Sequence, residues 1–311
     1  MGTRHKRYWL PIALLVLALA GCSAPAGRPA SAPPSTAAEG VATNVTLTVA
    51  DRPFQVHRPA GYRSGIAAPL VILLHGYTAT GAKQESYLKL TAESDRRGFL
   101  YAYPDSTADH EGNTFWNATD ACCDLYGSNV DDSGYLSRVI DAVKARFTVD
   151  AKRVYLVGHS NGGFMAYRMA CDHADQITAI VSLAGAMWSD VSRCQPSRPV
   201  SVLEIHGTAD ETIPFDGGRI ARHAYPSVTT TVADWRHLDG CADTPSPNPP
   251  AAQDLVGDVA GAETTAVVYA NDCRAGTRVE LWTMAGATHV PPFTPAFAPA
   301  VLDFLYAQVA P

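Results

Sequence analysis

Residues 153–163 read Arg-Val-Tyr-Leu-Val-Gly-His-Ser-Asn-Gly-Gly, and this stretch decides the fold of the chain. An apolar run rich in β-branched and aromatic residues ends in Gly-x-Ser-x-Gly, and residues 164–168 continue with a pattern typical of a helix. A serine on a tight turn from a strand into a helix is a nucleophile elbow. A chance match to five letters is the alternative, but it would not explain the strand before the motif and the helix after it.

The two outer glycines of the motif have a steric reason. Gly158 and Gly162 stand two residues before and two residues after Ser160. Side chains at these positions would collide with the neighbouring backbone of so tight a turn, and glycine removes the collision. We therefore expect Ser160 to be held above the sheet in a strained conformation. The amide of Asn161 and the helix N-terminus would then face an oxyanion that forms beside the serine.

The amino-terminal segment is predicted to be an export signal with a lipid attachment site. Basic residues within positions 4–7 precede an apolar run at 8–20, which is too short for a stable membrane span. Small residues then lead to Cys22, as in a lipobox. We expect residues 1–21 to be removed and acyl chains on Cys22 to anchor the protein to the outer face of the cell membrane. An ordinary signal peptide, which would leave a secreted protein, is the alternative.

Length and charge favour one exported domain without a nucleic-acid partner. Residues 22–40 are rich in Ala, Pro, Ser and Gly and are expected to form a flexible tether. Residues 41–311 suit one large α/β catalytic domain, which we expect to be a monomer. The formal charge of the chain is −6, and removal of residues 1–21 with their three basic side chains would make it −9. Such a negative charge disfavours nucleic acid as a partner.

Six of the seven cysteines follow Cys22, an even number that predicts disulfides in an exported chain. The expected pairs are Cys171 with Cys194 and Cys241 with Cys273. This leaves Cys122 and Cys123, which are adjacent, and a bridge between them would be strained because neighbouring Cα atoms are about 3.8 Å apart. Zinc is the competing interpretation of the cysteines, but neither a Cys-x-x-Cys motif nor clustered histidines support it.

Short apolar runs alternate with helical patterns along the rest of the chain. Residues 69–77 read Pro-Leu-Val-Ile-Leu-Leu-His-Gly-Tyr and predict a central strand that is buried on both faces. Other strands are predicted at 46–50, 54–57, 99–103, 177–183, 200–205 and 279–282. Other helices are predicted at 83–97, 130–147, 228–238 and 295–309, with Ser227 as the cap of the third. The alternation predicts a mostly parallel, doubly wound sheet with helices on both faces and ligands at the carboxyl ends of its strands.

A nucleophilic serine needs a histidine as general base. After a strand-turn-helix elbow, the acid and then the histidine follow the serine along the chain. His289 lies in a loop containing Gly and Ala after the last predicted strand, where the base is expected. His223 and His237 lie in or beside a helical stretch, and a solvated surface role suits them better. We therefore predict His289 as the base.

The acid and the second oxyanion donor are predicted from the ends of two strands. Asp210 directly follows a strand end, whereas Glu211 and Asp216 lie further into the loop, so Asp210 is the predicted acid. The pair His75-Gly76 ends the buried strand at 69–77. The backbone amide of Tyr77 is therefore expected to be the second oxyanion donor, beside that of Asn161.

Together these motifs resemble the polyhydroxybutyrate depolymerase-like esterases, a family that overlaps the feruloyl and acetylxylan esterases of carbohydrate esterase family 1. The stretches that carry the resemblance are Leu-Leu-His75-Gly76-Tyr77, Val130-Asp131-Asp132, Gly158-His-Ser160-Asn-Gly-Gly163, His206-Gly-Thr-Ala-Asp210, Pro214-Phe-Asp-Gly-Gly218 and Gly286-Ala-Thr-His289. The resemblance covers roughly residues 45–308 and implies an α/β-hydrolase fold. It also implies Ser160 as nucleophile, Asp210 and His289 as its partners, and Tyr77 and Asn161 as amide donors.

One stretch departs from the family pattern. Relatives often carry a Trp-Pro pair just beyond the histidine, whereas Val290-Pro291-Pro292 follow His289 here. An aromatic wall of the acyl pocket is therefore not expected from this position. Trp116, His159 and Trp188 are predicted to contact substrate, although Trp116 could equally pack the long loop at 104–129 onto the domain.

We predict a lipid-anchored serine esterase that acts on short-acyl or hydroxycinnamoyl esters, including those carried by a polysaccharide or polyester. Fifteen residues separate the strands that end at Leu183 and begin near Pro199, too few for an inserted lid domain. No metal or organic cofactor is implied. One alternative is a polyhydroxybutyrate depolymerase. Another, from a different class, is an inactive hydrolase fold that serves as a cell-surface binding module.

Overall fold

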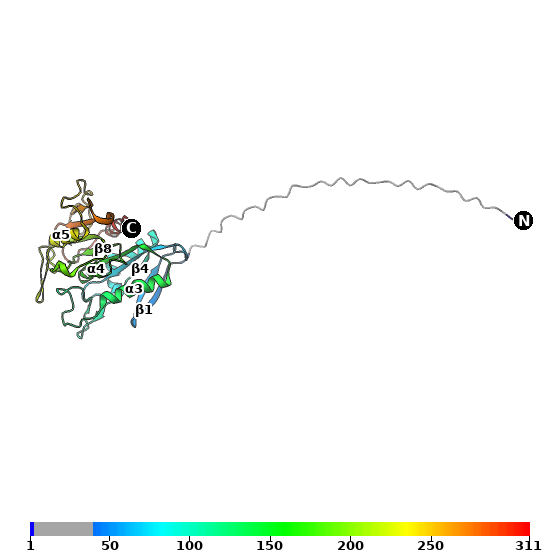
Figure 1. Ribbon diagram of the computed structural model, residues 1–311, viewed down its shortest axis with the longest axis horizontal. Helices are drawn as coiled ribbons and strands as arrows, with labels where there is room; N and C mark the ends of the chain where they lie inside the picture. Colours follow the sequence, from blue (N-terminus) through cyan, green and yellow to red (C-terminus); the bar gives the residue numbers. More distant parts are fainter. Residues whose placement is uncertain (3–39) are drawn as a thin grey trace. The chain divides into compact units, whose positions relative to one another are not determined.

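The strands predicted from the apolar runs lie side by side in one sheet (Figure 1). The structure is a computed structural model that describes residues 1–2 and 40–311. The strands of the main sheet are β1 (Thr43–Val49), β2 (Arg52–Arg58), β3 (Ala68–Leu74), β4 (Leu100–Ala102), β7 (Val149–His159), β8 (Ala179–Leu183), β9 (Ser201–Gly207), β12 (Thr264–Tyr269) and β13 (Val279–Met284). Their order across the sheet is β1-β2-β4-β3-β7-β8-β9-β13-β12.

The middle of this sheet is parallel and its edges are antiparallel. The strands β4, β3, β7, β8, β9 and β13 each run parallel to their neighbours within this group. At one edge β1 and β2, which correspond to the strands predicted at 46–50 and 54–57, form an antiparallel hairpin, and at the other edge β12 pairs antiparallel with β13. The predicted mostly parallel, doubly wound sheet is therefore confirmed.

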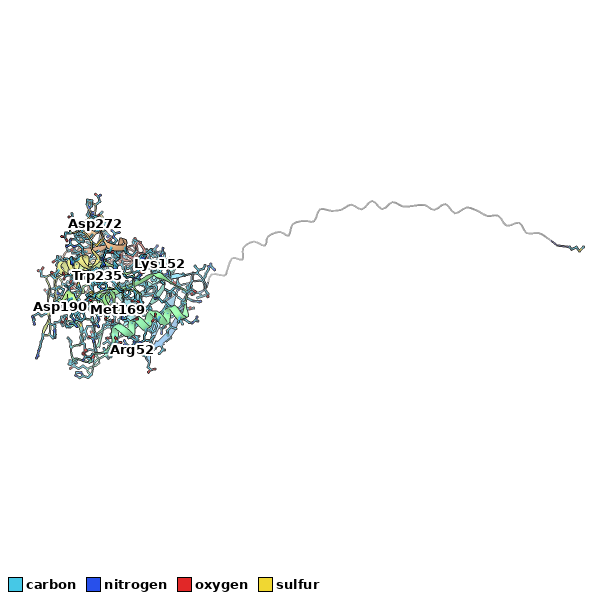
Figure 2. All side chains as sticks on the ribbon, in the orientation of Figure 1. Arg52, Lys152, Met169, Asp190, Trp235 and Asp272 are labelled. Atoms are coloured by element: carbon cyan, nitrogen blue, oxygen red, sulfur yellow. A yellow bond between two sulfur atoms is a disulfide. The ribbon has the colours of Figure 1, made fainter. Side chains whose placement is uncertain are left out.

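Helices cover both faces of the sheet in the described part of the chain. They are α1 (Gly81–Leu88), α2 (Leu90–Arg97), α3 (Asp132–Arg146), α4 (Asn161–Asp172), α5 (Val228–Asp239) and α6 (Phe297–Tyr306). One apolar core contains side chains of α3, α4 and α5, and the other contains side chains of α1, α2 and α6. On α5, Trp235 (Figure 2) donates its Nε1 hydrogen to Val200 O at 2.8 Å, which fastens this helix to the start of β9.

Strand β3 shows why the sheet is buried on both faces. Leu70, Ile72 and Leu74 belong to the first core, whereas Val71 and Leu73 belong to the second. Alternate side chains of a strand point to opposite faces, so a continuous apolar run fills both cores at once. Each such side chain contributes roughly 1.5–3 kcal/mol when it is fully buried.

The helix predicted at 83–97 is in fact two helices. Lys89 separates α1 from α2 because it adopts the left-handed conformation, with φ 56° and ψ 40°. The carboxylate of Glu85 then accepts hydrogen bonds from the amides of Leu90 and Thr91, at 3.1 and 3.0 Å. These bonds satisfy the first amides of α2, so the break costs little. The periodicity of the apolar residues does not reveal such a break.

Several short elements lie in segments that the apolar pattern leaves irregular. Strand β12 lies inside the Pro-rich excursion at 242–272, where Thr264-Thr-Ala-Val-Val-Tyr269 carries a β-branched signal. Small hairpins pair β5 (Thr107–Ala108) with β6 (Thr114–Phe115) and β10 (Gly218–Ile220) with β11 (His223–Tyr225). Two 3-10 turns, η1 (Val191–Arg193) and η2 (Arg274–Gly276), lie in the loops after β8 and β12.

Three disulfides join the six cysteines of the described residues. The two expected pairs, Cys171 with Cys194 and Cys241 with Cys273, are confirmed. Cys122 and Cys123 are bridged to each other across a cis peptide bond. The bridged sulfurs are not free to bind zinc, and no group of His, Cys, Asp or Glu suited to a metal occurs in the part of the chain that the structure describes.

Apart from residues 1, 2 and 40, the predicted signal peptide, the lipidation site Cys22 and the predicted tether fall within residues 3–39, outside the described residues. Residues 40–311 belong to one compact unit. None of the helices within residues 1–2 and 40–311 combines the length and the apolar character that crossing a bilayer requires.

Candidate active site

The nucleophile elbow has the predicted geometry. Ser160 lies between the last residue of β7 and the first residue of α4 and has φ 55° and ψ −121°, a strained backbone conformation for a residue other than glycine. A Cβ atom on Gly158 would lie 2.0 Å from Gly162 O. A Cβ atom on Gly162 would lie 2.1 Å from Leu74 O, at the end of the neighbouring strand. Both glycines are therefore required, the second by the close approach of β3 rather than by the turn itself.

The predicted acid and base are hydrogen-bonded to each other. His289 donates from Nδ1 to Asp210 Oδ2 at 2.7 Å. The other oxygen, Oδ1, accepts from the amides of Thr212 and Ile213 at 2.9 and 2.8 Å, which fixes the carboxylate after β9. Burial opposes the charge of Asp210, but hydrogen bonds from His206, His289 and Ile213 outweigh it and hold its pKa well below the usual range. A charged Asp210 keeps the hydrogen of His289 on Nδ1 and leaves Nε2 free to accept a proton, as a general base requires.

The competing candidates lie elsewhere. Glu211 and Asp216 are exposed, and neither has a hydrogen bond to a histidine among the described residues. The side chain of His223 is 56% exposed, and His237 is exposed on α5. The structure therefore brings Asp210 and His289 together and leaves the four competing candidates, Glu211, Asp216, His223 and His237, exposed to solvent.

Ser160 and His289 line one cleft of about 260 Å³ at the carboxyl ends of the parallel strands. The other lining residues are Gly76, Tyr77, Ala79, Lys83, Gln84, Tyr87, His159 and Val290. The structure gives no hydrogen bond between the Ser160 hydroxyl and His289 in the part of the chain that it describes. Such bonds are often long in ligand-free enzymes and tighten when substrate binds.

Two backbone amides at the cleft are free to bind an oxyanion. In the described residues, neither the amide of Tyr77 nor that of Asn161 has a hydrogen-bond acceptor. The adjoining amides are satisfied, since Gly76 N donates to Gln84 Oε1 at 3.2 Å and Thr78 N donates to Thr114 O at 2.8 Å. The neighbouring bonds thus position the loop after β3 and leave the Tyr77 amide available.

Of the three predicted substrate contacts, the structure brings His159 to the cleft. Its Nε2 donates to the backbone oxygen of His289 at 3.0 Å, so it also holds the loop of the base. Burial lowers the pKa of His159 to about 4, which keeps the ring neutral. Trp116 is fully buried behind the oxyanion loop, and Trp188 is buried in the core with Arg193 over its ring, 3.7 Å from the ring centroid. Both tryptophans therefore pack the domain and stand away from the cleft wall.

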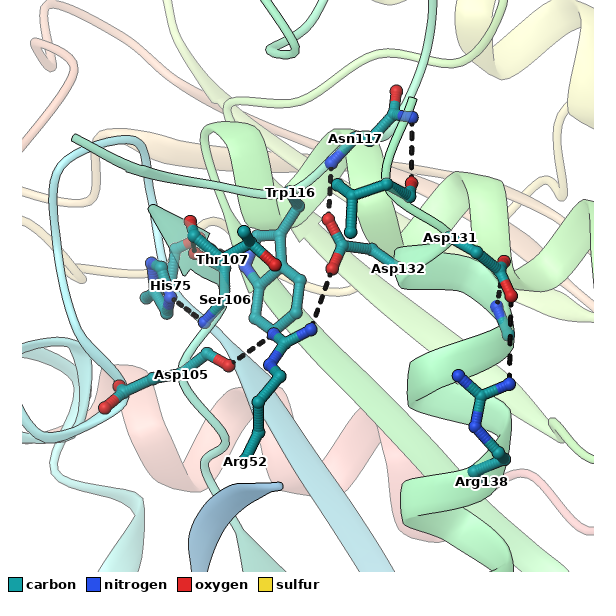
Figure 3. Close-up of polar contacts among 12 residues, drawn as sticks. Arg52, His75, Asp105, Ser106, Thr107, Trp116, Asn117, Asp131, Asp132 and Arg138 are labelled. Carbon is teal, nitrogen blue, oxygen red and sulfur yellow. Dashed lines mark hydrogen bonds and ion pairs between the residues drawn. The ribbon is translucent and has the colours of Figure 1, made fainter. Parts of the chain in front are cut away.

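Figure 3 shows the polar contacts that His75 and Arg52 make with the long loop at 104–129 and with the start of α3. His75 donates from Nδ1 to Gly76 O at 2.8 Å, and its Nε2 accepts from Ser106 N at 3.0 Å. Burial lowers the pKa of His75, which fits a neutral ring with one donor and one acceptor. Arg52 reaches Asp105 O at 2.7 Å and Asp132 Oδ1 at 3.2 Å and so joins both ends of this long loop.

Helix α1 supplies cleft residues that the sequence interpretation missed. Lys83, Gln84 and Tyr87 lie on one side of this helix at i, i+1 and i+4, a spacing that could have indicated a shared face. The Tyr87 ring lies 5.3 Å from that of Phe293, and its hydroxyl donates to Pro291 O at 2.8 Å. An aromatic wall therefore exists, although it comes from α1 rather than from the residue after His289. Gln84 Nε2 is buried and has no hydrogen-bond partner in the described residues.

Comparison with known proteins places the chain among ester-cleaving hydrolases. A model of the phospholipase/carboxylesterase family matches residues 63–242, more than half of the chain. The NocK protein of Nocardia uniformis subsp. tsuyamanensis, described as an inferred esterase, is 31% identical over 72% of this chain and 69% of its own length. Feruloyl esterase B of Piromyces equi is 26% identical over 74% of this chain, which spans only 41% of that relative.

A solved structure supports the fold independently. The acetyl xylan esterase from Aspergillus awamori superposes with a TM-score of 0.61, covering 85% of this chain and 99% of that one at 14% identity. Such low identity shows the shared α/β-hydrolase fold alone. The family model and the relatives show the activity class, and the chain is an α/β-hydrolase that belongs to the phospholipase/carboxylesterase family.

Proposed function

We propose that this protein is a serine carboxylic ester hydrolase with Ser160 as nucleophile, His289 as general base and Asp210 as the acid that orients the base. The observation that carries the proposal is the 2.7 Å hydrogen bond from His289 to Asp210, in a loop that lines the same cleft as the strained Ser160. No other acid-histidine pair in the described residues lies at the elbow.

The reaction follows from these positions. His289 Nε2 removes the hydroxyl proton of Ser160 as Oγ attacks the ester carbonyl. The free amides of Tyr77 and Asn161 bind the oxyanion that forms, and such donors contribute most in a site that excludes water. The protonated His289 then gives its proton to the leaving alcohol. Water, activated by His289, releases the acyl group from Ser160 in the second half of the reaction.

The cleft favours small acyl groups on an exposed ester. Its aromatic wall comes from Tyr87, and His159 lines the cleft next to Ser160, with its ring 5.5 Å from that of Tyr87. We propose short-acyl or hydroxycinnamoyl esters as substrates, including esters borne by a polysaccharide. The similarity to a feruloyl esterase supports this class. Hydroxybutyrate oligomers are the second candidate, because the sequence also resembles polyhydroxybutyrate depolymerase-like esterases.

The place of action is a separate proposal. We infer from residues 1–22 that the protein is exported and anchored to the outer face of the cell membrane through Cys22. Radiolabelled palmitate incorporated into the expressed full-length chain, and lost in Cys22→Ala, is the expected result. Export of an unlabelled protein would instead indicate an ordinary signal peptide.

Two experiments test the activity. An alkyl fluorophosphonate should label the protein on Ser160, with no label on Ser160→Ala, whereas an inactive binding module would stay unmodified. Hydrolysis rates should then be compared for short aliphatic esters, hydroxycinnamoyl esters, acetylated xylan and hydroxybutyrate oligomers. Faster turnover of hydroxybutyrate oligomers than of all the others would replace our substrate assignment by the depolymerase.

A further inference from the structure

A buried histidine that the proposed reaction does not use lies directly behind Asp210. His206 is the penultimate residue of β9, and its side chain is 1% exposed. Its Nδ1 lies 3.1 Å from Glu204 Oε1. Its Nε2 lies 2.7 Å from Ile213 O and 3.5 Å from Asp210 Oδ2. Both ring nitrogens therefore face oxygen atoms that accept hydrogen bonds.

His206 is one member of a network of buried polar side chains. Glu204, also buried, accepts at Oε2 from the Tyr167 hydroxyl at 3.1 Å. Tyr167 lies on α4, the helix that begins next to Ser160. This network runs from Tyr167 through Glu204 and His206 to Asp210, which accepts a hydrogen bond from His289. It thus connects the helix of the nucleophile to the acid of the triad through the interior of the domain.

The two carboxylates of this buried network, Glu204 and Asp210, require a nearby positive charge. Neither Glu204 nor Asp210 has an ion pair with a lysine or arginine in the described part of the chain, and both carboxyl groups are buried. A buried charge is costly unless an opposite charge or hydrogen bonds compensate it. Burial by itself would lower the pKa of His206, but hydrogen bonds to Asp210 and Glu204 outweigh it and raise the pKa to about 9. Burial also raises the pKa of Glu204 against the opposing effect of His206.

We propose that His206 is a positioning residue whose imidazolium, held between Glu204 and Asp210, keeps Asp210 ionised and aimed at His289. This inference rests on the proposed role of Asp210 and His289. The Nε2 hydrogen of His206 donates to Ile213 O, which closes the turn whose amides hold Asp210 Oδ1. The positive charge opposes the addition of a proton to the Asp210–His289 pair. The base therefore stays free at lower pH than it would without His206.

The groups that face His206 define the expected pH behaviour. They are Glu204 of β9 and Asp210 of the following loop. Tyr167 of α4 lies behind Glu204, and His289 lies behind Asp210. The charge of His206 also acts at longer range on His159, at the end of β7. The apolar neighbour is Phe215, whose ring meets that of His206 edge-on at 5.8 Å. Removal of the cation should raise the pKa of the Asp210–His289 pair, and removal of the Glu204 charge should lower it.

The pH profile of kcat/KM on a soluble short-chain ester tests this assignment with two variants. His206→Gln keeps a hydrogen-bond donor without the charge, and we expect its acid limb to move up by roughly one pH unit. Glu204→Gln keeps an acceptor for His206 and a partner for Tyr167, and its acid limb should move down. A purely structural role predicts lower activity with an unshifted acid limb in both variants, and that result would overturn the proposal.

A second measurement does not depend on activity. In wild-type protein labelled with ¹⁵N-histidine, both ring nitrogens of His206 should carry hydrogens at pH 7.5. The signal is assigned by its absence from His206→Gln or, if that variant does not fold, by backbone correlation to Ile205 and Gly207. A neutral His206 ring in this spectrum would refute the inference even in an active esterase. Absence of esterase activity from a protein with a charged His206 would refute the proposed function instead.

Discussion

The side chain of Asn161 makes a closed pair of hydrogen bonds with the backbone of Trp116. Its Oδ1 accepts from Trp116 N at 2.7 Å, and its Nδ2 donates to Trp116 O at 2.9 Å. The same Nδ2 lies 3.5 Å from Cys122 Sγ, and all of these groups are buried. The residue that follows the nucleophile therefore ties the elbow to the long loop and to its vicinal disulfide.

Asn161→Ala should lower both stability and turnover. It leaves the buried Trp116 amide without an acceptor, at a cost of about 1–3 kcal/mol, whereas the Trp116 carbonyl still accepts from the amides of Ala118 and Cys123 at 2.9 and 3.2 Å. We expect the free energy of unfolding in urea to fall by roughly 1–3 kcal/mol. Turnover should fall as well, because the loop behind His75 loses its attachment to the elbow. Asn248→Ala, at an exposed position, is the matched control, and equal behaviour of the two variants would show that the Trp116 contacts do not matter.

Ser160→Ala, His289→Ala and the double variant should lose activity to a similar extent. The members of a triad act as one unit, so their losses do not add, and each variant should fall by roughly 10³-fold or more. His237→Ala, an exposed histidine on α5, is the control and should keep full turnover. Near-normal turnover of His289→Ala together with an inactive His237→Ala would show that the base is assigned wrongly.

The parts of this molecule that could be predicted from sequence are those set by short-range patterns. The run at 69–77 forms β3 because every residue of a doubly covered strand must be apolar. The elbow is predictable because its glycines avoid steric clashes with backbone atoms within a few residues of Ser160 and at the end of the adjoining strand. Asp210 is predictable because strand ends in a parallel sheet converge on one edge.

The remainder depends on contacts between distant residues. Tyr87 forms the aromatic wall through a hydrogen bond to Pro291, 204 residues away, and no local pattern reports that pairing. Trp116 was a candidate for substrate contact, yet its Nε1 donates to His75 O at 3.1 Å from a fully buried position. His206 belongs to one of the motifs that carry the family resemblance, but its partner Glu204 is a single charged residue within an apolar strand. The apolar pattern of that strand does not predict that the two side chains form a pair. Burial decides the role of each of these residues, and burial is a property of the whole fold.

Asp239 should make the protein less stable as the pH rises from about 4 to about 7. It ends α5 in a fully buried position, and burial raises the pKa of its carboxyl from 3.8 to about 7. Between these two values the folded state holds a proton that the unfolded state has lost, so the free energy of unfolding falls with rising pH. Because each tenfold change in a protonation equilibrium is worth about 1.4 kcal/mol, the full effect is at most roughly 4 kcal/mol.

Asp239→Asn isolates this effect. The amide oxygen of asparagine can still accept from Val200 N, the contact that Asp239 Oδ1 makes at 3.3 Å. We expect the variant to match wild type near pH 4 and to be more stable above pH 7, when both are unfolded in urea at a series of pH values. A constant difference between the two proteins across this range would show that Asp239 keeps its charge in the folded state.

The cleft should work without activation at a lipid surface. The connection from β8 to β9 contains the 3-10 turn η1 and Cys194, which is bridged to Cys171 of α4, so this segment is short and fastened. Val290, on the rim beside His289, is 57% exposed, and the cleft opens to solvent there. An open cleft admits an ester on a polymer chain and has no cover for an interface to displace.

The hydrolysis rate of a medium-chain ester should therefore follow the concentration of dissolved substrate smoothly through the solubility limit. An abrupt rise in rate when the emulsion first forms would instead reveal a segment that moves away from the cleft at the interface. Reduction of the Cys171–Cys194 bridge would then be expected to enhance that rise.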